Sequence, residues 1–345
     1  MRLLWRLTKT LLWALLLVVI GLALPVVWVE TMCRATGRQT AYTPILPPES
    51  QRPEARTLLT WPEWQIVHAY EDYAKVITTG DPHDYAYLPE IVSFWSSLCT
   101  LSKASGPQGG VPFDSKTMLY TIGASFTLEL GLKATYEETL GRLATLIRGA
   151  ERAELDDLTA TMATDYAAFL YQVPWYRWDF SRDAATLSAT TAAGFRNWER
   201  RTAIGLEFRG KAAYAGMIAT AVAATGFDAL TMRSVVTGLS AADLAAIVGV
   251  TVIRTRPEGV EIETARYQTF TDLARILAAK GARFVEIAGN DDILYTSLSA
   301  APTEPGALMD MKRQGFSDFR HLHLVKVSDL HAALLAGGVE HIHDY

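Results

Sequence analysis

Two pairs of histidines near the C-terminus have the residue type and the spacing of metal ligands. Each pair follows the pattern H-x-H on a segment that we expect to be a β-strand, and the two-residue period of a strand places both imidazoles of a pair on one face. Imidazoles grouped in this way suit zinc, copper or nickel, so the cofactor that this pattern suggests is a divalent transition metal. The four candidate ligands are His321, His323, His341 and His343.

The four imidazoles converge only if the two strands are neighbours, and Asp318 or Asp344 would then serve as an extra ligand or an outer hydrogen-bond partner. The helix expected between the strands has about ten residues, which is short for a crossover connection. The alternative is that both pairs lie on the solvated face of amphipathic strands. Strand pairing decides between the two interpretations.

A second polar group lies on a helix that we expect from Thr60 to Thr79. His68, Glu71 and Asp72 share one face of it, because residues three and four apart are neighbours on a helix. These side chains could form a metal or acid/base cluster. We expect instead that this face is solvated, opposite an apolar face that packs on the core.

Ser240 stands in a degenerate G-x-S-x-A segment at an expected strand-to-helix turn, where the nucleophile of a hydrolase would lie. Together with Asp243 it also forms S-x-x-D, the ordinary start of a helix, and we expect this second role. The chain contains no H-E-x-x-H, C-x-x-C, Walker or dinucleotide-binding pattern. No catalytic residue is therefore predicted.

The aromatic segment from Pro174 to Phe180 ends the helical part of the chain. Its side chains could line a pocket or lie on the bilayer surface, because indole and phenol rings combine an apolar body with a polar atom. The alternative is a packed corner between subdomains. The residues concerned are Trp175, Tyr176 and Trp178.

A membrane anchor is predicted at residues 11–29, a run of nineteen residues without a charge. Such a run reaches about 28 Å as a helix, close to the thickness of the hydrocarbon core. Arg2, Arg6 and Lys9 precede it, which favours a cytoplasmic N-terminus and an extracytoplasmic bulk at a bacterial-type inner membrane. The alternative is a cleaved secretory signal.

Cys33 and Cys99 are the two cysteines, and both would lie on the translocated side, where disulfides persist. A bridge between them would close a long loop and so constrain the unfolded chain. The alternative is that Cys99 is a small core residue.

The composition limits the partners. The net charge is −5 and no long basic block occurs, so nucleic acid is not expected as a partner. The lipid bilayer is the expected partner, together with another membrane or periplasmic protein.

The expected fold class is α+β. An N-terminal transmembrane helix and an α-helical domain precede a ferredoxin-like (βαββαβ) α/β sandwich domain, to which a C-terminal βαβ tail is added. The expected segments are a cytoplasmic N-terminus (1–10), the transmembrane helix (11–29), a Pro-rich tether (30–58), the helical domain (59–226) and the ferredoxin-like domain (227–345).

Because no catalytic motif is present, we expect a single-pass membrane-anchored protein with an extracytoplasmic binding or assembly module. A metal-dependent enzyme or metal-handling protein that uses the H-x-H pairs is the alternative function.

Overall fold

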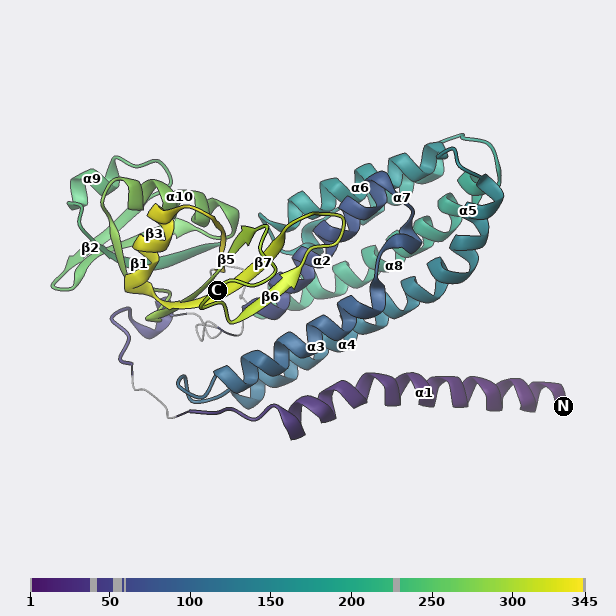
Figure 1. Cartoon of the computed structure of the whole chain (residues 1–345), viewed down its shortest axis with the longest axis horizontal. Helices are drawn as coiled ribbons and strands as arrows, with labels where there is room; N and C mark the ends of the chain where they lie inside the picture. Colours follow the sequence, from purple (N-terminus) through teal and green to yellow (C-terminus); the bar gives the residue numbers. More distant parts are fainter. Residues whose placement is uncertain (1, 38–41, 52–57, 59, 226–229, 344–345) are drawn as a thin grey trace. The chain divides into compact units, whose positions relative to one another are not determined.

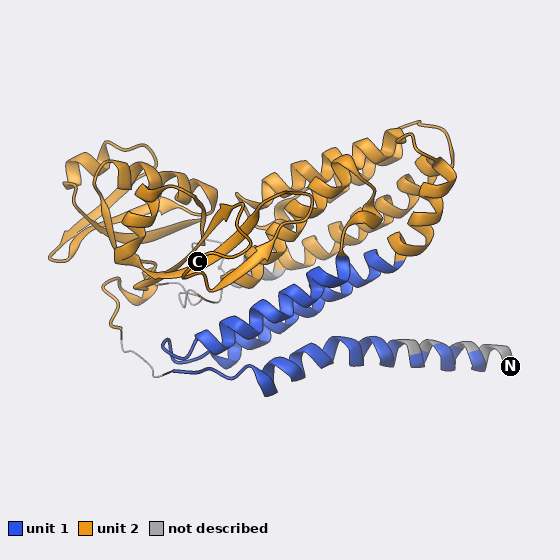
Figure 2. Ribbon diagram, viewed as in Figure 1, with its two compact units in different colours: residues 1–41, 87–135 blue, residues 42–86, 136–345 orange. Residues whose placement is uncertain are grey.

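The computed structural model of the chain describes residues 2–37, 42–51, 58, 60–225 and 230–343. These residues form a mixed structure of helices and two four-stranded antiparallel sheets (Figure 1). The chain divides into two compact units, one made of residues 1–41 and 87–135 and the other of residues 42–86 and 136–345 (Figure 2). The segment expected as one helical domain, 59–226, thus contributes to both units.

The smaller unit contains the N-terminal apolar helix α1 (Arg2–Met32), followed in the chain by α3 (Tyr87–Ala104) and α4 (Phe113–Tyr136). By length and composition, Thr8–Met32 of α1 is the one candidate membrane span among the described residues, although a signal sequence passes the same test. Cys33, directly after α1, forms the disulfide with Cys99 of α3 that the sequence suggested.

The apolar sequence after Ser115 predicts a helix that Ser115 caps and that is buried all round, and α4 differs from this prediction in two ways. It begins at Phe113, so Ser115 lies inside the helix and is not its cap. The near-continuous apolar sequence predicted a helix buried all round, but Leu128 and Leu132 are exposed while Phe126 and Leu130 are buried. The helix therefore has one buried side, which includes Gly123, where an added Cβ would lie 2.6 Å from the Phe94 ring.

The larger unit contains the remaining long helices. Helix α2 confirms the helix predicted from Thr60 to Thr79, and Gly80 follows its last residue. Thr135 with Glu138 has the pattern of a capping box and predicts a helix start. This prediction is wrong, because the chain continues from α4 through a π-helical segment, Glu137–Gly141, in which Glu137 turns inward to the buried Arg200. The helices are α2 (Trp61–Thr79), α5 (Arg142–Arg148), α6 (Glu154–Leu170), α7 (Phe180–Ala189) and α8 (Phe195–Thr225).

The first sheet has the strand order β2-β3-β1-β4, and all its pairings are antiparallel. Ser240 caps α9, the short helix between β1 and β2 in the chain, since the Ser240 hydroxyl accepts a hydrogen bond from the Asp243 N–H at 3.1 Å. The elements in chain order are β1 (Thr231–Thr237), α9 (Ala241–Ala245), β2 (Thr251–Arg256), β3 (Gly259–Ala265), α10 (Gln268–Ala279) and β4 (Arg283–Ile287).

The second sheet has the order β6-β7-β5-β8 and is also antiparallel throughout. Both H-x-H segments lie on its strands, as the sequence predicted. The elements are β5 (Asp292–Ser299), β6 (Met309–Lys312), β7 (Phe319–Lys326), α11 (Leu330–Ala336) and β8 (Val339–His343).

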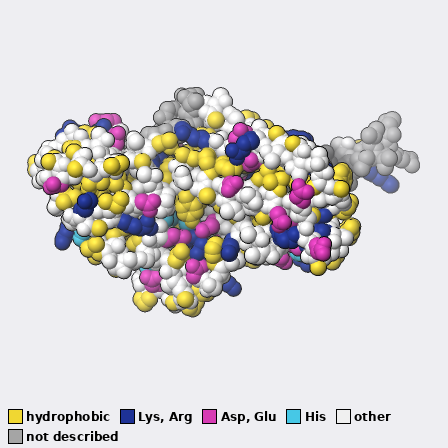
Figure 3. Space-filling view, turned by 90° about the horizontal axis from the view of Figure 1, so that it is seen from above, with side chains coloured by type: hydrophobic (Ala, Val, Ile, Leu, Met, Phe, Trp, Pro, Cys, Tyr) yellow, Lys and Arg dark blue, Asp and Glu magenta, His cyan; other side chains and the backbone are white. Residues whose placement is uncertain are grey.

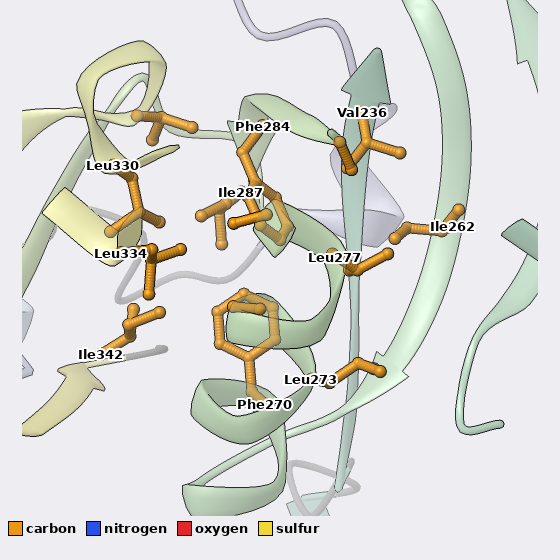
Figure 4. Packing of buried hydrophobic residues seen from close by; sticks show 14 of the residues in the cluster. Val236, Ile262, Phe270, Leu273, Leu277, Phe284, Ile287, Leu330, Leu334 and Ile342 are labelled. Carbon is orange, nitrogen blue, oxygen red and sulfur yellow. The ribbon is translucent and has the colours of Figure 1, made fainter. Parts of the chain in front are cut away.

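One hydrophobic core joins the two sheets. Figure 4 shows Phe270 and Leu277 of α10 and Leu330 and Leu334 of α11 pointing into it, together with Ile342 of β8. All five side chains are buried. Because Ile342 is held in this core, its neighbours His341 and His343 are fixed on the opposite face of β8.

Candidate functional site

The two histidine pairs lie on opposite faces of the second sheet. Strand β5 separates β7 from β8, so the condition for four converging imidazoles is not met. Odd- and even-numbered residues of β5 point to opposite faces of the sheet. One histidine pair is in register with odd-numbered residues of β5 and the other with even-numbered residues. On β7, His321 is opposite Ser297 and His323 is opposite Tyr295; on β8, His341 is opposite Thr296 and His343 is opposite Leu294.

The alternative of solvated histidines is also wrong, because all four imidazoles are buried. We call the face with Ser297, Ser299, His321 and His323 the serine face. The face with His341 and His343, which contacts Trp61 and Trp64 of α2, we call the tryptophan face.

On the serine face, His321 is held through both ring nitrogens. Its Nδ1 lies 2.7 Å from a carboxylate oxygen of Asp310 on β6, and its Nε2 lies 2.9 Å from the Ser299 hydroxyl. Asp310 accepts from Nδ1–H, so Nε2 carries the lone pair and accepts from the hydroxyl. The hydrogen bond with His321 lowers the pKa of Asp310.

His323 has a different environment on the same face. Its Nε2 lies 3.1 Å from the Ser297 hydroxyl, which donates to Glu304 at 3.0 Å, and its ring stacks on Tyr295 with centroids 4.7 Å apart. Burial lowers its pKa. The Glu304 carboxylate also lies 3.8 Å from Nε2 of His321 and 3.6 Å from that of His323.

On the tryptophan face, helix α2 contradicts the expectation of a solvated polar side. His68 and Asp72 are 4 % and 5 % exposed, because α2 packs against α6 and also contacts His341 and His343 of β8 through its tryptophans. The ring of His68 lies 6.0 Å from that of His343, which lies 5.1 Å from that of His341. A third imidazole from α2 thus joins the two from β8.

Two of these imidazoles are held through Nδ1. His341 Nδ1 lies 3.1 Å from the side-chain oxygen of Gln268, an acceptor, so this nitrogen carries the proton. His68 Nδ1 lies 3.0 Å from the Tyr171 hydroxyl, which donates its own proton to Glu71 at 3.1 Å. Both arrangements leave the lone pair on Nε2.

The remaining nitrogens of this cluster are buried without a hydrogen-bond partner among the described residues. They are Nε2 of His68, Nε2 of His341 and both ring nitrogens of His343. A buried polar atom without a partner costs about 1–3 kcal/mol, so four at one place call for a bound species that pairs with them.

Beside the imidazoles lies a buried ion-pair network centred on Arg320. Its guanidinium donates to both oxygens of Glu340, at 2.6 and 2.7 Å, and to Glu71 at 2.8 Å. Glu340 has no partner residue in the β5–β8 register, because it is the extra residue of a β-bulge. The bulge directs the Glu340 side chain towards Arg320. Arg313 donates to the second oxygen of Glu71.

Ligand atoms of His68, Glu71 and Glu340 lie within 4.8 Å of one another, a spacing that could hold a cation. Arg320 binds both of these carboxylates, however, and already supplies the positive charge there. Nε2 of His68, on the other side of the ring, is buried without a hydrogen-bond partner among the described residues.

The pKa values of the tryptophan-face imidazoles predict acid destabilisation. Burial lowers the pKa of His68, His341 and His343 below 6.5, the ordinary value. Above pH 6.5 these three imidazoles are neutral in both the folded and the unfolded chain, so the free energy of unfolding does not change with pH on their account. Below it the unfolded chain takes up protons that the folded chain does not, so the free energy of unfolding falls by up to about 1.4 kcal/mol per pH unit for each histidine.

Urea unfolding of chelator-treated protein at pH 7.5, 6.5 and 5.5 measures this slope. His343→Phe should reduce this slope by the contribution of one histidine, because phenylalanine takes up no proton. A free energy of unfolding that stays constant over this range would contradict the burial of neutral imidazoles.

The other predicted site residues have structural surroundings. Asp318 pairs with Arg313 at 2.9 Å, not with a histidine, and Asp344 lies outside the described residues. The aromatic segment forms a short 3₁₀ turn that packs between α6, α7 and α8, which fits the packed-corner interpretation. Its packed side chains are Trp175, Tyr176 and Trp178.

Sequence reasoning missed several residues of the serine face. Ser297 and Ser299 form an S-x-S pair with the same spacing as H-x-H, a signal that could have been read. Glu304 and Asp310 lie in or after a loop with no periodicity, and only the folded chain brings them to the histidines.

Comparisons with protein-family models, curated protein sequences and solved structures found no match to this chain. The site geometry therefore carries the functional proposals.

Proposed function

We propose that this chain is a membrane-anchored, extracytoplasmic metal-binding protein whose ion is held on the tryptophan face by His68, His341 and His343. The observation that carries the proposal is the set of four buried imidazole nitrogens that have no partner among the described residues. Neutral imidazole nitrogen is a good ligand for zinc, copper, nickel and cobalt ions.

The rings of His341 and His343 are spaced as two ligands of one ion would be. Two imidazoles bound to one zinc ion at about 2.0 Å have ring centroids roughly 5 Å apart in tetrahedral geometry. The observed separations are 5.1 Å and 6.0 Å. The three histidines do not bring a ligand atom each within 4.8 Å of one another, so His68 would have to move towards the other two for all three to bind one ion.

The outer contacts support the same ion. Metal-bound histidines usually donate their second ring N–H to an oxygen, which fixes the tautomer. Gln268 supplies this oxygen for His341. For His68 the oxygen is the Tyr171 hydroxyl, which in turn donates to Glu71. The charge of Arg320 acts against a nearby cation, but Glu71 and Glu340 compensate it.

The serine face is a weaker metal site. There the hydroxyls of Ser299 and Ser297 already occupy the Nε2 positions of His321 and His323. An ion would have to displace both hydrogen bonds. Binding of a second ion by these two histidines is therefore an outcome to be tested rather than the proposal.

The test is the stoichiometry of Co²⁺ binding to the detergent-solubilised full chain, measured by calorimetry and visible absorption. We expect one tightly bound ion, with absorption typical of a tetrahedral site. His343→Phe, which keeps an aromatic ring but removes both ring nitrogens, should abolish this binding, because one of three ligands is lost.

His83→Ala is the matched control, since His83 lies in a short 3₁₀ turn and not on the helix or strand that carries the cluster. It should bind one ion as the unmodified chain does. Unchanged binding in His343→Phe would contradict the proposal, as would loss of binding only in His321→Ala.

The membrane anchorage and orientation are part of the proposal. The apolar helix α1 and the positive charges before it support a cytoplasmic N-terminus. The disulfide supports exposure of the bulk to an oxidising compartment. The strand order β2-β3-β1-β4 with helices α9 and α10 supports the ferredoxin-like arrangement.

A role as an assembly module has its own support. Apolar side chains are exposed along the π-helical segment Glu137–Gly141, α5 and α8, and such surfaces are typical of protein contacts. The expected partner is another membrane or periplasmic protein. Positive and negative side chains are mixed on the face shown in Figure 3, which fits the expectation that nucleic acid is not a partner. The exposed apolar residues include Leu140, Leu143, Leu146, Trp198 and Leu206.

A further inference from the structure

We propose that the serine face carries a second, independent activity, in which Ser299 is an acyl-accepting nucleophile, His321 its general base and Asp310 the group that orients the base. The hydroxyl lies 2.9 Å from His321 Nε2, and Asp310 lies 2.7 Å from Nδ1 of the same ring. A nucleophile within hydrogen-bond reach of a base that a third group holds in place is the arrangement that activates serine.

Three elements fix this geometry. Ser299 ends β5, His321 lies on the neighbouring strand β7, and Asp310 lies on β6 at the edge of the sheet. In the β6–β7 register Asp310 is directly opposite His321, so the carboxylate and the imidazole share a face. The base is therefore held by the pairing of two strands and not by a loose loop.

The base and the nucleophile differ in burial, as catalysis requires. The His321 imidazole is fully buried, which keeps it in one orientation, whereas Ser299 is partly exposed and can meet a substrate. Ser299 Oγ also accepts a hydrogen bond from the Ala301 N–H at 3.2 Å, which stabilises negative charge as the proton leaves.

The substrate class that fits is a carboxylic ester. Ser299 Oγ attacks the carbonyl carbon and its proton moves to His321 Nε2. The C–O bond to the alcohol then breaks, and His321 returns the proton to the departing oxygen. Water, deprotonated by His321, next attacks the acyl-serine, so that the acid is released and the serine hydroxyl restored. No redox partner is needed.

The neighbouring serine-histidine pair provides an internal comparison. Ser297 lies 3.1 Å from His323 Nε2, but its hydroxyl donates to Glu304 at 3.0 Å, so the imidazole does not act as its acceptor. The two pairs share a face and a strand spacing, and of the two only Ser299 has its proton directed at a base.

The experiment treats the full chain in detergent with a fluorophosphonate probe, maps the labelled residue by mass spectrometry, and measures hydrolysis of p-nitrophenyl acetate. We expect labelling of Ser299. Ser299→Ala should remove the label and lower kcat/KM by about 10³-fold or more, and Asp310→Asn should lower kcat to a similar extent with little change in KM. Ser297→Ala is the matched control and should keep both label and activity.

An unmodified chain that takes no label would overturn the proposal. Hydrolysis that persists in Ser299→Ala and is lost with a chelator would also overturn it, and would assign the hydrolysis to a bound metal instead. Removal of metal from the tryptophan face should leave labelling of Ser299 unchanged, so the two proposals fail separately.

Discussion

Replacing Arg320 with methionine should lower the free energy of unfolding by about 3–5 kcal/mol, the range expected when one partner of a buried ion pair is removed. Arg320 is 3 % exposed, and it supplies the two guanidinium hydrogen bonds that the Glu340 carboxylate accepts. Glu71 would keep its contact with Arg313, so most of the loss comes from Glu340. Urea unfolding at pH 7.5 measures the change.

Two further variants sharpen this prediction. Arg182→Met removes an ion pair whose arginine is 60 % exposed, and it should cost at most about 1 kcal/mol. Adding Glu340→Gln to Arg320→Met should recover part of the loss, because the buried group is then neutral. A decrease in the free energy of unfolding below about 1 kcal/mol for Arg320→Met alone would show that these buried ion pairs do not form in solution.

Removal of the disulfide should have a comparable effect on the smaller unit. Cys33 and Cys99 are separated by 66 positions, and closing a loop of this length should stabilise the fold by roughly 4 kcal/mol in the chain-entropy model. The Cys33→Ser/Cys99→Ser variant should lose that amount. Thermal unfolding in detergent, followed by circular dichroism, measures it.

The chain without reductant and the same chain with reductant provide the control for this prediction. Reduction of the unmodified protein should reproduce the double variant, whereas the variant itself should not respond to reductant. Equal stability of all forms would mean that α1 and α3 are held by packing alone.

The secondary structure could be predicted well where local signals are strong. Ser240 with Asp243 caps α9, and Gly80 ends α2, as local capping chemistry requires. The prediction failed at Thr135, because the pairing of Glu137 with the distant Arg200 outweighs a local capping signal.

The candidate site could be predicted only in part. The alternation of H-x-H correctly placed each histidine pair on one face of a strand, but sequence order does not reveal that β5 lies between β7 and β8. The polar side of α2 was expected in water because periodicity shows two faces without showing what covers them. His68 is buried since α2 packs against α6 and contacts β8.

The bulge at Glu340 is a further feature that periodicity cannot predict. It turns one additional side chain towards Arg320, which completes the ion-pair network beside the imidazoles. One inserted position thus sets the charge balance of the tryptophan face.

The most direct test of the metal-binding claim is an anomalous-difference map from crystals of the protein grown with Co²⁺. The proposal predicts a peak between Nε2 of His68, Nε2 of His341 and the ring of His343. A map with no peak at this position, or with its peak beside His321 and His323, would contradict it.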